Sequence, residues 1–86
     1  MKVAYASTFF RQLKKLPLDL QEEAFEKEEL FKKDPKNKLL KTHKLKGRLQ
    51  GSYSFSVNYK TRIIFEYLNK DKVVFISIGD HDVYKK

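Results

Sequence analysis

The sequence predicts an α+β fold in the order βααβββ, with a small antiparallel sheet packed on a hairpin of two helices. Three runs between residues 51 and 84 alternate from one side chain to the next, and one face of each run is apolar. Before them, residues 7–33 repeat apolar side chains at helical spacing. At 86 residues the chain is expected to form one domain, residues 1–86, with no room for a second.

Two helices are expected, one on each side of Pro17. In the first, Phe9, Leu13 and Leu16 recur at i, i+4 and i+7 and so share one face. The second covers residues 18–33, which are rich in Glu, Lys, Leu and Ala and carry acidic side chains early and lysines late, as the helix dipole favours. An Asp-Pro pair then ends it, because the residue before a proline leaves the helical region.

Strands are expected at residues 2–6, 52–57, 62–67 and 74–79, with a tight hairpin turn at residues 69–71. The apolar sides of the last three strands are expected to meet the helices, and they carry Tyr53, Phe55, Val57, Ile63, Phe65, Tyr67, Val74, Ile76 and Ile78. The opposite sides are expected to stay open to a partner, and they carry Ser54, Ser56, Arg62, Glu66 and Ser77, with His81 just beyond the last strand.

The charge distribution indicates a polyanionic partner. The formal net charge is +8, which suits nucleic acid, an anionic membrane surface or an acidic protein, although a solvated basic surface is the alternative. Acidic side chains cluster in residues 22–29, whereas residues 36–48 hold six basic side chains and no acidic one. This segregation is more informative than the total charge.

Several site types are not expected. The chain has no cysteine, which excludes disulfides and thiolate metal sites and fits a cytosolic compartment. The sequence shows no apolar run that suits a signal peptide or a membrane span. The two histidines, His43 and His81, lie nearly forty residues apart without metal-ligand spacing, so we expect no metal and no cofactor.

Four segments together are similar to one known family. HKLKG at residues 43–47, YSF at 53–55, YKTRIIF at 59–65 and GDHDVY at 79–84 resemble, in order and spacing, the RelE/ParE toxin superfamily. The resemblance extends over nearly the whole chain and is nearest to the RelE- and YafQ-like branch. It implies the fold expected above.

The resemblance also implies a function. Members of this superfamily are mostly toxins of bacterial type II toxin–antitoxin modules and act in the cytoplasm. The RelE and YafQ branches cut mRNA in the ribosomal A site, whereas the ParE branch poisons DNA gyrase. The expected partner is a small acidic antitoxin that wraps the helices and covers the basic groove. The toxin alone is expected to be monomeric and its antitoxin complex a heterotetramer or larger, with no membrane partner.

The site residues follow from the resemblance, position by position. Arg62 matches an arginine on the middle strand of the nuclease branches. His81 matches a basic residue or histidine after the last strand, and Tyr84 a terminal aromatic residue. His43 matches a histidine four residues before the loop glycine in the YafQ branch.

These residues suit RNA cleavage without a metal, in which the 2′-OH attacks the phosphate. A base must take the 2′-OH proton and an acid must protonate the leaving oxygen. Histidine, with an unperturbed pKa of about 6.5, can do either, and the division of roles between His43 and His81 stays open. Arg62 offers a planar fork for two phosphate oxygens, and Tyr84 can stack on a base or donate its hydroxyl. Other phosphates are expected to meet Lys44, Lys46, Arg48 and Lys60.

Alternatives remain for both residues and function. Arg62 can instead pair with Glu66, and Tyr84 can instead close the edge of the core. Serines stand at positions 54 and 56, where RelE carries two lysines, and at 77, where YafQ-type members often carry an arginine. These serines favour a ParE-like toxin that targets gyrase, or a catalytically weak RNA-binding member.

Overall fold

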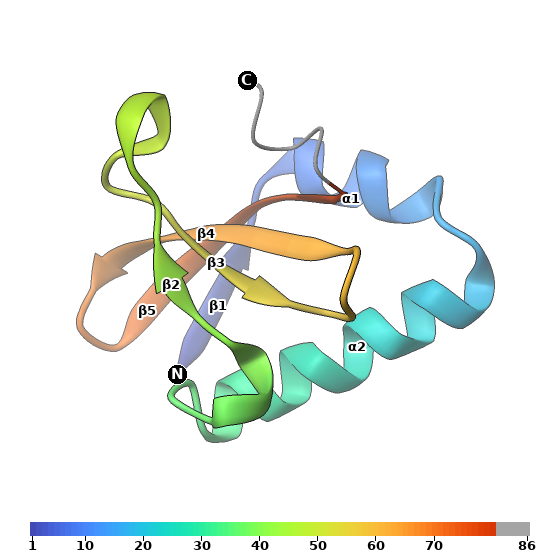
Figure 1. Ribbon diagram of the computed structural model, residues 1–86, viewed down its shortest axis with the longest axis horizontal. Helices are drawn as coiled ribbons and strands as arrows, with labels where there is room; N and C mark the ends of the chain where they lie inside the picture. The colour runs from blue at the N-terminus through green and yellow to red at the C-terminus, as the bar shows by residue number, and fades with distance from the viewer. Residues whose placement is uncertain (81–86) are drawn as a thin grey trace.

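Two helices lie against one face of a mixed sheet, which has five strands in the described part of the chain (Figure 1). The computed structural model describes residues 1–80, without the side chain of Arg48. The helices are α1 (Ser7–Lys14) and α2 (Leu18–Lys33). The strands are β1 (Lys2–Tyr5), β2 (His43–Lys44), β3 (Tyr53–Ser56), β4 (Arg62–Asn69) and β5 (Lys72–Gly79). Two short 3-10 turns flank β2, namely η1 (Lys38–Leu40) and η2 (Gly47–Leu49). Within residues 1–80, none of the helices combines the length and the apolar character that crossing a membrane would need.

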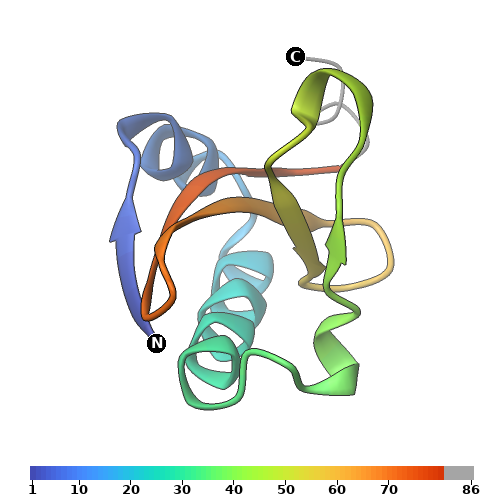
Figure 2. The same cartoon turned by 90° about the vertical axis from the view of Figure 1, so that its left-hand side faces the viewer.

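The strand order is β1-β5-β4-β3-β2, with β1 and β2 at the two edges (Figure 2, blue and green). The predicted α+β arrangement is confirmed, and β3, β4 and β5 form the predicted antiparallel meander. The sheet as a whole is mixed rather than antiparallel, because β1 runs parallel to β5. Two helices separate β1 from the rest of the sheet, so β1 can lie at either edge and in either direction. Side-chain alternation along a strand does not indicate which of these arrangements forms. The edge strand β2 arises in a stretch where no strand was predicted.

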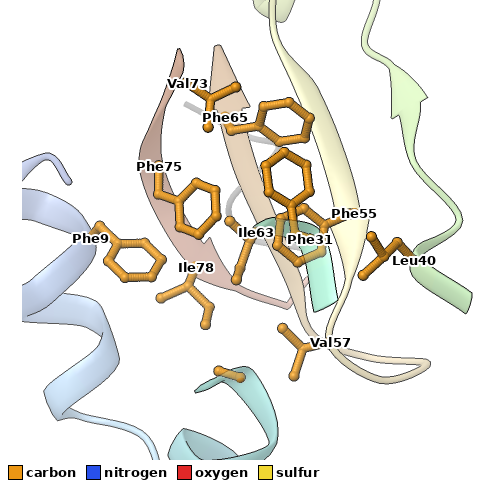
Figure 3. Packing of buried hydrophobic residues seen from close by; sticks show 11 residues of the cluster. Phe9, Phe31, Leu40, Phe55, Val57, Ile63, Phe65, Val73, Phe75 and Ile78 are labelled. Atoms are coloured by element: carbon orange, nitrogen blue, oxygen red, sulfur yellow. The ribbon is translucent and has the colours of Figure 1, made fainter. Parts of the chain in front are cut away.

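The core lies between the helices and the sheet, and its largest members are five phenylalanines with no exposed surface (Figure 3): Phe9, Phe31, Phe55, Phe65 and Phe75. Phe31 of α2 stacks on Phe55 with 4.9 Å between ring centroids, and it meets Phe65 edge-on at 5.0 Å. Phe9 of α1 contacts Phe75 at 5.6 Å. Burying one such ring stabilises the fold by about 2–3 kcal/mol, so the cluster holds both helices on the same sheet face.

A β-bulge interrupts the pairing of β4 with β5. Ile64 lies opposite Ser77, but the next residue of β4, Phe65, lies opposite Phe75. Ile76 is therefore the extra residue on β5, and the alternation of its side chains changes phase at that point. On the N-terminal side of the bulge, odd-numbered residues of β5 face the helices.

The bulge corrects part of the predicted core. Val73 and Phe75 are fully buried and Ile78 is 2% exposed, whereas Val74 and Ile76 are only half-buried. The prediction that Val74 and Ile76 belong to the core was therefore wrong, and that for Ile78 is confirmed. The error follows from strict alternation, which assumes an unbroken ladder along the strand.

The outer edge of β5 is covered by two different elements. β1 pairs with it as far as Phe75, and Ala6 then donates to the Phe75 carbonyl at 2.9 Å. Beyond that point, the Gln12 side chain of α1 accepts a hydrogen bond from the backbone N–H of Ile78 at 2.9 Å. An amide left unpaired here would cost stability and offer a site for strand addition, so Gln12 completes the edge.

A buried acid connects β1 to α2. Glu28 of α2 is 6% exposed, and its Oε1 accepts a hydrogen bond from the Tyr5 hydroxyl at 2.9 Å. Burial raises the pKa of the Glu28 carboxyl, although the Tyr5 hydrogen bond and the charge of Lys32 act against this shift. The Tyr5 hydroxyl also has a raised pKa, first because it is partly buried and then because Glu28 lies beside it.

Candidate functional site

The sheet face turned away from the helices carries two of the residues that the sequence predicts for a site, Arg62 and His43. Strand pairing forms one row across β2, β3, β4 and β5, made of His43, Ser54, Ile64 and Ser77. The next row across β3, β4 and β5 is made of Ser56, Arg62 and Gly79. Because side chains alternate along each strand, Arg62 and His43 project from the same face.

Arg62 on β4 and His43 on β2 have one strand, β3, between them, which makes two inter-strand spacings across the sheet and two residues along it. With strands about 4.8 Å apart and a rise of about 3.3 Å per residue, their Cα atoms lie about 12 Å apart. The Arg62 guanidinium is held at the turn before β4, and the His43 ring lies beside Lys41 and Ser54.

The guanidinium of Arg62 is held by the turn that precedes β4. Its Nη1 donates to the backbone carbonyl of Asn58, and also to that of Thr61 at 3.2 Å. The Asn58 side chain fixes this turn, because its Oδ1 accepts from the backbone N–H groups of Lys60 at 2.9 Å and Thr61 at 2.7 Å. The predicted turn at residues 58–60 is confirmed, and it positions the arginine.

The same turn is attached to α2. Lys27 donates to the backbone carbonyl of Val57 at 3.0 Å, and the Nδ2 of Asn58 donates to Glu23 at 3.2 Å. The turn therefore has contacts on both sides, with Arg62 toward the open face and with α2 toward the helices. A cation held in this way has lost much of its side-chain freedom before any ligand arrives.

Glu66 has a different partner from the predicted alternative. Its Oε2 accepts a hydrogen bond from the Ser52 hydroxyl at 2.9 Å, while Arg62 donates to the turn carbonyls. The alternative in which Glu66 holds Arg62 is therefore wrong. Both hydrogen bonds of Arg62 use Nη1, so its Nη2 has no hydrogen-bond partner among the described residues.

His43 lies at the exposed edge of the face with both ring nitrogens near polar groups. Its Nδ1 is 3.3 Å from the backbone carbonyl of Lys41, and its Nε2 is 3.4 Å from the Ser54 hydroxyl. A carbonyl only accepts, so the first contact requires a proton on Nδ1. In the neutral ring, Nε2 is then the basic nitrogen and is directed toward the strand that pairs with β4.

Two predicted site residues, His81 and Tyr84, lie outside the described residues. The last described part of β5 pairs Gly79 with Arg62, and Asp80 follows directly. The chain thus leaves the described region beside Arg62.

Comparisons with known proteins give the fold. No protein-family model matches the chain, and no curated protein matches it. Solved structures do match: YafQ from E. coli strain BL21(DE3) has a TM-score of 0.80 and 16% identity, over 99% of this chain and 98% of that one. A YoeB/ParE toxin from Agrobacterium tumefaciens has a TM-score of 0.76 and 18% identity, over 94% and 99%. The toxin–antitoxin complex RelBE2 from Mycobacterium tuberculosis gives 0.77 and 20%, over 93% and 96%.

The chain has the RelE/ParE toxin fold. The predicted resemblance is confirmed at this level, over almost the full length of both chains in each comparison. Identities of 16–20% establish the fold alone, so the activity has to be argued from the residues of the site.

The predicted phosphate-binding cations do not all lie on one face of this RelE-like sheet. Lys60 is exposed in the turn that holds Arg62, and Lys46 is exposed between β2 and η2. Lys44 pairs with Tyr53, so it projects on the helix side of the sheet, opposite to His43. The side chain of Arg48 is not described.

The serines of the RelE-like face are covered by their surroundings. Ser54, Ser56 and Ser77 are 0%, 7% and 8% exposed, although the sequence predicts an open face there. Hydroxyl side chains are short and extend little above the surface of a sheet. On this face His43 and Glu66 are exposed and Arg62 is half-buried, whereas the serines between them are not accessible.

Sequence reasoning missed Asn58, which orients Arg62, and Ser52, which binds Glu66. An asparagine two residues after a strand and four before an arginine is the available signal for the first, because asparagine often closes such turns. Within residues 1–80, no group of three or more His, Asp or Glu side chains is placed to hold a metal ion.

Proposed function

We propose that this protein is the toxin of a type II toxin–antitoxin module and that it acts in the cytoplasm as an endoribonuclease on mRNA in the ribosomal A site. The observation that carries this proposal is the fixed arginine on the sheet face away from the helices, with Nη1 tied to the Asn58 turn. The RelE-like fold and a formal charge of +8 support an RNA substrate.

In the proposed reaction the 2′-OH of the RNA attacks the adjacent phosphorus and the bond to the 5′-oxygen breaks. A base takes the 2′-OH proton and an acid gives a proton to the leaving oxygen, which leaves a 2′,3′-cyclic phosphate and a 5′-OH. His43 and His81 share these two roles. Arg62 stabilises the charge that develops on the phosphate, and Tyr84 stacks on a base or donates its hydroxyl. No metal takes part in the proposed reaction.

Lys46, Lys60 and Arg48 would hold phosphates beside the cleaved bond, and Lys44 would hold one at the strand edge. The exposure of Lys60 next to the Arg62 turn supports this arrangement. The proposed protein partner is an acidic antitoxin that neutralises the charge of +8. Among the structural neighbours is a heterotetrameric YoeB–YefM toxin–antitoxin complex from Staphylococcus aureus, which supports a heterotetramer or larger for the complex here. The toxin alone is proposed to be monomeric.

The test is to express the protein in bacteria and to map the 5′ ends of translated mRNA. Arg62→Ala is expected to slow cleavage about a hundredfold, because it removes a donor to the phosphate in the transition state. Arg11→Ala is the matched control, since it removes an exposed arginine of α1 and the same charge. Growth arrest without new 5′ ends would reject the nuclease, and cleavage at equal rates in both variants would reject the site.

A second candidate is a ParE-like toxin or a catalytically weak RNA-binding member. The buried serines at positions 54, 56 and 77 favour it, because they leave the centre of the face without cations. In that case the expressed protein would inhibit DNA supercoiling by gyrase, or would bind RNA and leave it intact. A supercoiling assay with purified gyrase separates these two outcomes from each other.

A further inference from the structure

A basic, aromatic pocket of about 400 Å³ lies on the helix side of the sheet, outside the candidate site. It opens between η1, the start of β3 and the end of β4, and its walls include Tyr53, Tyr67, Lys36, Lys38 and Lys41. Among the described residues that line it, none is acidic. Its volume is within the range of sites that hold a small organic ligand or one unit of a polymer.

The aromatic wall of the pocket packs against the core and is partly accessible. Tyr53 stacks on the buried ring of Phe65 with 5.6 Å between centroids. Tyr67 meets Tyr53 edge-on at 5.2 Å and contacts Phe65 at 5.7 Å. Tyr67 is nevertheless 44% exposed. A ring that the core holds on one side and leaves open on the other is suited to stacking on a nucleic-acid base.

The lysines of the pocket lie on a loop that is anchored in the core and has hydrogen bonds of its own. Leu40 of η1 is fully buried and anchors the loop in the core. Asn37 accepts a hydrogen bond from the backbone N–H of Leu39 at 2.9 Å, and it donates to Asp34 at 3.2 Å. Lys41 adopts the left-handed conformation with φ of 50°, which turns the chain toward β2. The loop therefore presents three cations beside the rings, as a phosphate backbone requires.

We propose that this pocket binds one nucleotide of single-stranded RNA away from the cleaved bond, with its base on Tyr67 and its phosphates on the lysines. Thr42 lines the pocket, and the next residue, His43, belongs to the candidate site. The edge strand β2 has only two residues, and its Lys44 projects on the pocket side. An RNA strand that passes this edge can reach both sites. An isolated anion or a folded acidic protein would not need two sites along one edge. This inference rests on the proposed function.

The first test measures binding of a fluorescent 2′-O-methyl RNA of about ten nucleotides, which lacks the attacking hydroxyl and stays intact. The double substitution Lys36→Gln and Lys38→Gln is expected to weaken binding about tenfold. It should also reduce the slope of log K against log salt by about 1.4, the value for two lost single-strand phosphate contacts. The control, Lys14→Gln with Lys15→Gln in and after α1, removes the same charge and should change binding less than about twofold.

The second test addresses the aromatic wall. Tyr67→Leu is expected to weaken binding of the same RNA about tenfold through the loss of stacking. Phe25→Leu is the matched control, because that ring of α2 is 61% exposed and lies outside the pocket. Equal affinities for the two variants would overturn the stacking role, and equal effects of the two lysine pairs would overturn the phosphate role.

The third test separates RNA from other anions by following the NMR signals of the Tyr53 and Tyr67 rings. Adenosine 5′-monophosphate is expected to shift them, whereas inorganic phosphate and a glutamate-rich peptide are expected to shift them far less. Equal shifts with phosphate would indicate a plain anion site, and equal shifts with the peptide would indicate a protein partner. Either result overturns the inference.

The inference and the proposed function can fail separately. If the pocket variants lose affinity for the intact RNA analogue while 5′-end mapping shows no cleavage, the nuclease proposal fails and the RNA pocket stands. If mRNA is cleaved and the pocket variants bind as their controls do, the pocket fails and the nuclease stands.

Discussion

Asn58 decides the orientation of Arg62 without belonging to the proposed reaction. Its backbone carbonyl accepts from Arg62, its Oδ1 accepts from Lys60 and Thr61, and its Nδ2 donates to Glu23 on α2. One small side chain thus connects a helix, a turn and the guanidinium. In catalysis, a displacement of an ångström at such a group can cost orders of magnitude in rate.

Asn58→Ala is therefore expected to lower the rate of mRNA cleavage about tenfold through misplacement of Arg62. Asn58→Asp keeps the acceptor for the two backbone N–H groups but replaces the donor to Glu23 by a second carboxylate, so it should recover only part of the activity that Asn58→Ala loses. The matched control is Asn69→Ala, which removes a similar acceptor from the hairpin after β4, where Asn69 accepts from the N–H of Asp71 at 2.8 Å. Cleavage by the Asn58→Ala variant at the rate of the Asn69 control would contradict this positioning role.

For individual residues, the sequence predicted which side chains share a face of the sheet. It did not predict their hydrogen-bond partners. The face of Arg62 follows from alternation, which is a local property of the strand. Its hydrogen bonds to backbone carbonyls depend on the exact path of the turn, and the Ser52–Glu66 contact depends on the register between β3 and β4. His81 and Tyr84 remain predictions from the resemblance to RelE and YafQ toxins.

Among the elements, β3, β4 and both helices were predictable because their patterns are continuous in the sequence. The bulge at Ile76 could not be predicted, because it depends on how β5 pairs with β4. A continuous apolar run has the same sequence pattern with or without a bulge. The short β2 strand was missed for a similar reason. His43 and Lys44 become a strand only through hydrogen bonds to β3, and their own composition does not favour one.

Phe31 connects α2 to three strands, since its ring contacts Phe55, Phe65 and Phe75 at 4.9–5.6 Å. Phe31→Ala is expected to lower the free energy of unfolding by about 3–5 kcal/mol, the usual cost of such a cavity. Phe25→Ala on the exposed side of the same helix should change it by less than about 0.5 kcal/mol. Urea denaturation of both variants measures the difference, and similar values would show that α2 is not held by this ring.

At the scale of the whole molecule, the core is filled by aromatic rings, and a buried acid lies at the contact between β1 and α2. Glu28 has a pKa raised above its usual 4.5, so the folded state holds its proton to higher pH than the unfolded chain does. The free energy of unfolding should therefore be unaffected by Glu28 below about pH 4.5 and should decrease as the pH rises through the raised pKa.

Glu28→Gln is expected to remove this part of the pH dependence and to stabilise the protein at neutral pH, because an amide carries no charge and its oxygen can still accept from Tyr5. Glu26→Gln, on the exposed side of α2, should leave the pH profile of wild type unchanged. Thermal unfolding at a series of pH values measures both. If Glu28→Gln followed the wild-type profile, the buried carboxyl would not be its source.

The strand order has a consequence for the synthesis of the protein. β5 is synthesised after the other described strands, yet it lies between β1 and β4 and carries three of the core side chains. Until it emerges, β1 has no neighbour to pair with, and Phe9 and Phe31 lack the ring of Phe75. A nascent chain that stops before β5 cannot assemble its sheet, so the activity proposed here would be confined to molecules whose translation has passed β5.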